Sequence, residues 1–135
     1  MNLKRMADQY RDQLMATGIR AREEVAEVVA VPEYYRHIGY AQAYLHGWYV
    51  KLSKAHGSEK GLEDLKMSWT TLVELNRLTR PYHRRHENVP VEMYDQVLEL
   101  ARKAQGYLEQ FLKKLPLVTE ECLTYAVQTS GIQLK

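Results

Sequence analysis

The residues whose types and spacing could do chemistry gather in one short segment, which runs from Arg77 to His86. These ten residues contain four arginines, two histidines and no acidic side chain. The residues before the segment carry ten basic and ten acidic side chains, and those after it carry five basic and seven acidic ones. The formal net charge of +2 therefore arises from an excess of positive charge in this one segment.

The use of arginine in this segment favours binding of phosphate groups. A guanidinium group keeps its charge at any physiological pH, and its planar fork of donors matches two oxygens of one phosphate. We predict that the segment contacts a nucleic-acid backbone through Arg77, Arg80, Arg84 and Arg85. The alternative is a solvated surface whose arginines pair with nearby acidic residues, such as Glu74, Glu87 and Glu92.

A second pattern lies inside the same segment, where five residues separate Arg80 from His86. The sequence Arg-Pro-Tyr-His-Arg-Arg-His resembles the Arg-x4–6-His motif of HEPN ribonucleases, which are small all-helical proteins. The resemblance implies metal-independent RNA cleavage, with His86 as general acid or base and Arg80 stabilising charge on the phosphate. The sequence departs from the family at Pro81, where a polar residue normally follows the arginine.

Other catalytic and metal-binding patterns are absent from the sequence. It has no glycine-rich phosphate loop, no Gly-x-Ser-x-Gly turn and no Cys-x-x-Cys pair, and its one cysteine is Cys122. His83, His86 and Glu87 carry donor atoms for a divalent ion, but the adjacent guanidinium groups would repel it. We therefore expect no metal and no cofactor, and the sequence favours binding over catalysis.

The segment after Pro32 is rich in aromatic residues and forms a second candidate surface. Tyr40 and Tyr44 lie one helical turn apart and off the apolar stripe of this segment. Small residues at four-residue steps, Gly39, Ala43 and Gly47, would let a neighbouring backbone come close. We predict an interaction face here, for a protein partner, another copy of the chain or stacked bases. The alternative is a central bundle helix whose tyrosine hydroxyls reach the rim.

The elements that must position these residues are helices, because apolar residues recur at steps of three and four. The pattern predicts helices over residues 2–29, 33–55 and 90–115, a third helix that starts at 58 or 62 and runs to 79, and a short fifth helix over 119–128. We expect Pro81 and Pro116 to end the third and fourth helices, which leaves residues 80–89 as a loop. Gly57 is the expected left-handed cap of the second helix, and Gly18 could bend or split the first.

Together these elements predict an all-α fold. We expect an up-down bundle of four long helices plus a short C-terminal fifth helix, forming a single domain over residues 1–135. A hydrophobic fraction of 45% and a charged fraction of 27% are typical of a globular protein, and no apolar run reaches the length of a membrane span. The N-terminus does not resemble a signal peptide, so we predict a cytoplasmic protein with no membrane partner.

These features favour a non-catalytic binding or assembly subunit that contacts nucleic-acid backbone. By fold-level analogy, it would be similar to the small all-helical subunits of CRISPR effector complexes, which pack in a row along nucleic acid. Its expected partners are a nucleic acid, RNA or DNA, and a protein or a second copy of itself. Two alternatives stay open, the ribonuclease described above and a module that binds only proteins.

Overall fold

The computed structural model describes residues 3–130, and every regular element within them is helical. The elements are α1 (Leu3–Ala30), α2 (Tyr35–His56), α3 (Glu63–Arg84), the 3-10 turn η1 (Val91–Met93) and α4 (Tyr94–Ser130). The prediction of an all-α protein is therefore confirmed. In the part of the chain that the structure describes, no helix has an apolar stretch that could cross a membrane.

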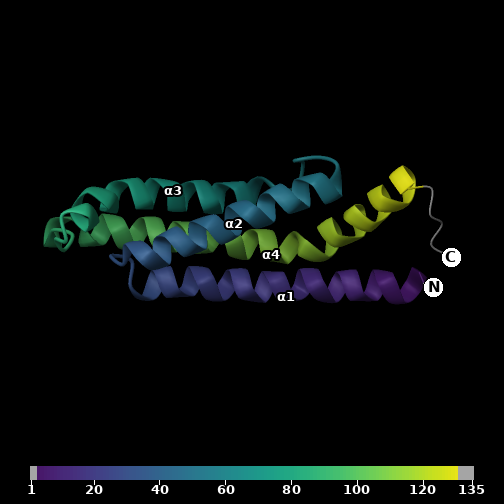
Figure 1. Ribbon diagram of the computed structural model, residues 1–135, viewed down its shortest axis with the longest axis horizontal. Helices are drawn as coiled ribbons and strands as arrows, with labels where there is room; N and C mark the ends of the chain where they lie inside the picture. Colours follow the sequence, from purple (N-terminus) through teal and green to yellow (C-terminus); the bar gives the residue numbers. More distant parts are fainter. Residues whose placement is uncertain (1–2, 131–135) are drawn as a thin grey trace.

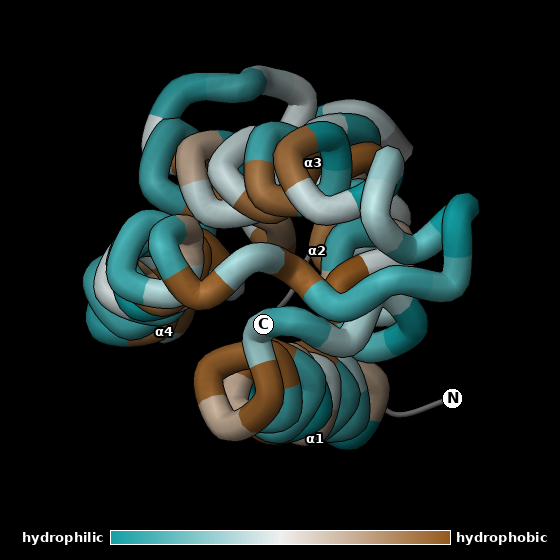
Figure 2. The backbone as a smooth tube through the Cα atoms, turned by 90° about the vertical axis from the view of Figure 1, so that its left-hand side faces the viewer, coloured by the Kyte–Doolittle hydropathy of each residue, from teal (hydrophilic) through white to brown (hydrophobic). Residues whose placement is uncertain are grey.

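The four α-helices run up and down beside one another (Figure 1). The α1–α2 and α3–α4 connections lie at the same end of the bundle, on the left of Figure 1. Viewed from that end, α1 and α3 lie on opposite sides, and these two helices do not contact each other (Figure 2). The core between the helices is made of fully buried apolar side chains, including Leu45, Leu72, Leu108 and Phe111.

Helix α1 passes through Gly18 without a break. A Cβ atom at this glycine would lie 3.1 Å from the side chains of both Leu112 and Leu115 on α4. Gly18 is therefore a close-approach position between two helices, which is a packing reason for a residue that weakens an isolated helix.

The prediction that Pro81 ends the third helix was wrong, because α3 continues to Arg84. Proline removes the N–H that would bond to the carbonyl of Arg77, four residues earlier. Both residues are exposed, so water can satisfy this carbonyl. The last turn is also held by tertiary contacts, since the ring of His83 stacks on Tyr35 of α2 with centroids 4.3 Å apart. Residues 80–84 are thus helical, and the loop is shorter than predicted.

The predicted fifth helix is also wrong as a separate element, because α4 continues through Pro116 to Ser130. The helix bends on the C-terminal side of its middle, as proline-containing helices do (Figure 1). Val118 and Cys122 are buried beyond the proline, and this burial keeps the segment helical. The Thr119 hydroxyl donates to the Leu115 carbonyl at 2.8 Å, as a threonine inside a helix does.

The predicted cap at Gly57 is confirmed. Its φ of 73° is left-handed, and its N–H donates to the Ser53 carbonyl at 3.0 Å. Glycine adopts this conformation without the steric cost of a Cβ atom, so α2 can stop and turn sharply here.

Candidate functional site

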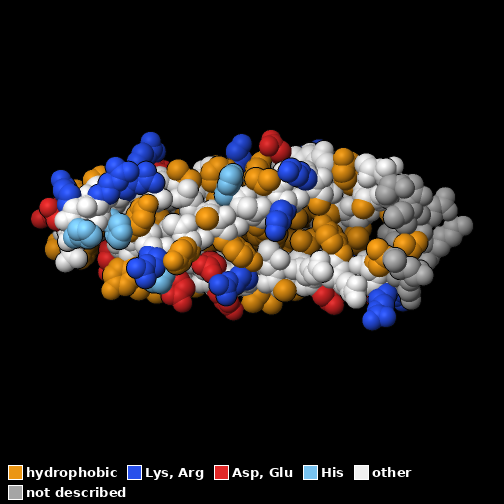
Figure 3. Space-filling model, in the orientation of Figure 1, with side chains coloured by type: hydrophobic (Ala, Val, Ile, Leu, Met, Phe, Trp, Pro, Cys, Tyr) orange, Lys and Arg blue, Asp and Glu red, His pale blue; other side chains and the backbone are white. Residues whose placement is uncertain are grey.

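Three of the four predicted arginines share one exposed face of α3. Because the helix continues to Arg84, the residues Arg77, Arg80 and Arg84 fall within an arc of about 60° at roughly 100° per residue. All three are exposed, and we call them the arginine row. Lys and Arg side chains gather at the end of the molecule where α3 terminates, beside histidines (Figure 3).

The arginine row has no acidic partner within residues 3–130. Elsewhere the molecule does pair its arginines across helices. Arg11 binds Glu120 at 2.7 Å, and the Arg22 guanidinium lies 2.8 Å from Glu109. The alternative interpretation, a solvated surface whose arginines pair with nearby acids, has one such pair, between Arg85 and Glu87. No acid pairs with Arg77, Arg80 or Arg84 in the described part of the chain. The three guanidinium groups of the row therefore remain available to an anionic ligand, as far as the described residues show.

Arg85 lies just past the end of α3 and differs from the row. Its guanidinium group lies 3.3 Å from the carboxylate of Glu87 and 5.3 Å from the ring centroid of Tyr82. Part of its charge is thus neutralised locally and its side chain is anchored on an aromatic ring. Arg85 is a weaker candidate for phosphate binding than the three arginines of the row.

Part of this charge has a local structural role. His83 and Arg84 lie in the last turn of α3, where a positive charge interacts favourably with the negative end of the helix dipole. The effect fades within one turn, so it does not account for Arg77 or Arg80.

His86 lies two residues past the end of α3 and adopts a left-handed conformation with φ 54°. The His86 N–H donates to the His83 carbonyl at 3.0 Å, and the Glu87 N–H donates to the Tyr82 carbonyl at 2.8 Å. These two bonds form a Schellman cap, whose left-handed position is usually glycine. A histidine there costs about 1 kcal/mol.

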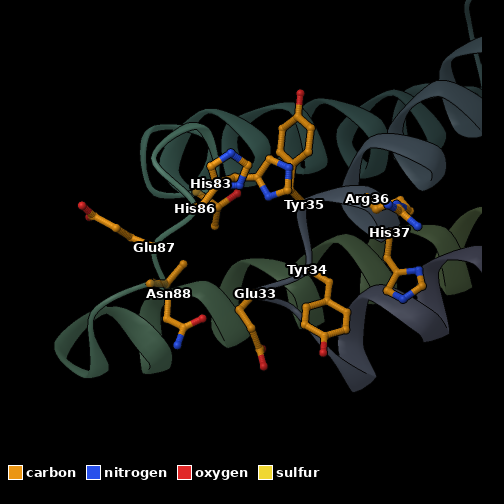
Figure 4. Close-up of a pocket in the computed structure, with 11 residues that line it drawn as sticks. Glu33, Tyr34, Tyr35, Arg36, His37, His83, His86, Glu87 and Asn88 are labelled. Atoms are coloured by element: carbon orange, nitrogen blue, oxygen red, sulfur yellow. The ribbon is translucent and has the colours of Figure 1, made fainter.

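A cavity of about 480 Å³ lies between the two connections at this end of the bundle (Figure 4). Its walls come from the start of α2 and from the end of α3 with the following loop. They include the polar and aromatic side chains of Tyr34, Tyr35, Arg36, His37, His83, His86 and Asn88. Arg80 is not among the lining residues, so this cavity does not hold both members of the ribonuclease-like pair.

Sequence reasoning missed Arg36 and His37, which face the arginine segment from a different helix. Arg36 is exposed and forms no ion pair within residues 3–130. The position of these two residues follows from the order of the helices in the bundle. Antiparallel helices with short connections bring the first and third connections to the same end of a bundle, so residues just after Pro32 lie near those just after Arg84.

The two tyrosines of the predicted interaction face lie in different environments. Tyr40 is 61% exposed, and Gly39 and Gly47 on the same helix have open space beside them. Tyr44 is half-buried in a groove of about 500 Å³ between α1 and α2, where its hydroxyl donates to the Thr17 carbonyl at 3.5 Å. Burial raises the pKa of Tyr44. Tyr40 is therefore the residue that presents a free aromatic surface.

Within the described residues, no group of three or more His, Cys, Asp or Glu side chains is arranged to hold a metal ion. Comparisons with protein-family models, curated proteins and solved structures found no match to this chain.

Proposed function

We propose that this protein is a non-catalytic helical subunit that binds the phosphate backbone of a nucleic acid. The observation that carries the proposal is the arginine row, Arg77, Arg80 and Arg84. Its three guanidinium groups lie on one exposed face of α3 and have no acidic partner within residues 3–130.

The spacing of the row suits a phosphate backbone. Arg77 and Arg84 are seven residues apart, which corresponds to about 10 Å along the helix axis. Bidentate arginine contacts at this spacing position a strand without reading its bases. Binding is therefore expected to depend strongly on salt and weakly on sequence.

The proposal includes assembly with a protein partner or with a second copy of the chain. Tyr40 supports it, because an exposed aromatic ring beside small residues is typical of contact surfaces. By fold-level analogy alone, such a cytoplasmic subunit would resemble the small helical subunits of CRISPR effector complexes.

The test is a titration of a labelled single strand by fluorescence anisotropy at salt concentrations between about 50 and 200 mM. The variant replaces Arg77, Arg80 and Arg84 by alanine. Each lost contact lowers the slope of log K against log salt by about 0.7 for a single strand, so the variant should lose roughly two units. A wild-type protein that does not bind at the lowest salt would refute the proposal.

A matched control removes the same charge from positions that lie away from the arginine row. Lys54, Lys60 and Lys113 are exposed, and their replacement by alanine should leave the salt slope unchanged. Equal slopes for both triple variants would show that net charge, and not the row, drives binding. When the labelled strand is RNA, the same samples also test the ribonuclease alternative. A non-catalytic protein leaves this RNA at its full length.

A further inference from the structure

We infer that the cavity at the bundle end takes one unpaired nucleotide of the strand that the arginine row contacts. The inference rests on the proposed function and adds the kind of nucleic acid, which is a single strand with at least one base free to leave its neighbours.

The size and walls of the cavity fit a nucleotide. A volume of about 480 Å³ lies within the range of about 300–1,000 Å³ that is typical of small-molecule sites. The walls offer flat rings for stacking, since Tyr35 and His83 form a stacked pair and Tyr34 stacks on His37 with centroids 5.8 Å apart. Aromatic rings of this kind hold unpaired bases, whereas the bases of a duplex are already stacked and paired.

The polar groups of the cavity match the rest of a nucleotide. The Asn88 amide can donate to and accept from a base edge, and the Arg36 guanidinium can bind a phosphate oxygen. Two acids also line the cavity, Glu33 and Glu87. Glu87 is paired with Arg85, and its carboxylate points outward, away from His83 and His37 (Figure 4).

The arginine row and the cavity share the last two turns of α3. Thr79 and His83 line the cavity, and the next residues along the helix, Arg80 and Arg84, belong to the row. A strand bound along the row therefore reaches the cavity by passing from one face of α3 to the adjoining face. Because the row and the cavity adjoin, a nucleotide of the bound strand is a better occupant of the cavity than a free small molecule.

His86 is a second observation at the same place. It lines the cavity and holds a left-handed conformation that glycine would adopt at lower cost. Backbone strain of this kind is retained where the side chain serves a purpose. The substitution His86→Gly removes the imidazole and relieves the strain, so it tests the cavity without endangering the fold.

The experiment compares a short DNA single strand with the same strand lacking all its bases. Both carry the same phosphates, so the arginine row treats them alike. The wild-type protein should prefer the strand with bases by about tenfold. The double variant Tyr34→Ala, His86→Gly should bind both strands equally and keep the wild-type salt slope.

The control variant is Tyr94→Ala, which removes an exposed tyrosine at the start of α4 that does not line the cavity, and it should keep the preference. The inference fails if the wild-type protein binds both strands equally or if the double variant keeps the preference. In either case, the proposed function still stands if replacing the arginine row by alanine lowers the salt slope. If neither strand binds at low salt, both proposals fall.

Discussion

Cys122 is a buried thiol whose surroundings keep it neutral. Its side chain is 1% exposed, and burial raises the pKa of the Cys122 thiol against the smaller opposing effect of a hydrogen bond with Tyr10. Burial and the neighbouring Cys122 raise the pKa of Tyr10 to about 12. A neutral buried thiol is a poor nucleophile, so Cys122 contributes packing between α4 and α1.

This pair predicts a pH dependence of stability. In the unfolded chain a tyrosine loses its proton near its ordinary pKa of about 10, whereas folded Tyr10 holds its proton until about pH 12. Between these values the unfolded state binds fewer protons, so the free energy of unfolding falls as the pH rises. Burial also raises the pKa of Tyr44 and Tyr49, which act in the same direction.

Urea unfolding at several pH values between about 9 and 12 measures this decline. Tyr10→Phe should make the decline shallower than in the wild-type protein, because it removes one of the three phenols. A decline of equal steepness in both proteins would contradict the raised pKa of Tyr10.

At the scale of elements, contacts made by the ends of the helices fix how neighbouring helices pack. The end of α2 is held against the second half of α4, where the buried His56 lies 2.8 Å from the Glu121 carboxylate. Gly57 lies beside it with φ 73°, and a Cβ atom there would collide with the ring of Tyr125. The two halves of α4 thus contact different parts of the bundle on either side of Pro116.

Alanine substitutions at three glycines separate backbone strain from this collision. Gly61 has φ 87° with open space around it, so Gly61→Ala should cost only the left-handed strain, about 1 kcal/mol. Gly57→Ala should cost roughly 1 kcal/mol more, because the collision adds to the same strain. Gly106 is helical with nothing nearby, and Gly106→Ala should stabilise the protein by about 0.5–1 kcal/mol.

Chemical denaturation gives the three free energies. The double variant Gly57→Ala, Tyr125→Ala should cost less than the sum of its two single variants, because both remove the same contact. Strict additivity would show that Tyr125 does not crowd Gly57.

The sequence predicted the helices well and their ends less well. Steps of three and four place Leu45, Leu72 and Leu108 on inner faces, and all three are fully buried. The rule that proline ends a helix failed at Pro81, where the lost hydrogen bond lies on an exposed face and His83 stacks on Tyr35. It failed at Pro116 because the burial of Val118 and Cys122 offsets a cost of about 3 kcal/mol. This outcome matters for the site. Because residues 80–84 are helical and do not form the predicted loop, Arg77, Arg80 and Arg84 share one face of α3.

The cavity could not be predicted from local patterns. It depends on which two connections meet, and Arg36 and His37 lie about fifty residues away in sequence from His86. Spacing within one segment made the arginines and His86 candidates, whereas the cavity residues on α2 require the topology of the bundle.

At the scale of the whole molecule, the main basic surface and the polar cavity lie at the same end of the bundle. The arginine row and the cavity lie where the α1–α2 and α3–α4 connections come together. At the start of α3, by contrast, Asp64 pairs with Lys114 of α4 at 2.8 Å. Within residues 3–130, the bundle thus presents three arginines without an acidic partner along one face of α3. An extended strand can lie along that helix without any change in the fold.

The most direct measurement of this account is an NMR titration of the arginine side chains with a short single strand at low salt. The Nε–Hε signals of Arg77, Arg80 and Arg84 should shift together in proportion to the strand added. Arg11 and Arg22, already bound to Glu120 and Glu109, should not move. Shifts confined to other parts of the chain, with the three signals of the row unmoved, would contradict the central claim that this row binds the phosphate backbone.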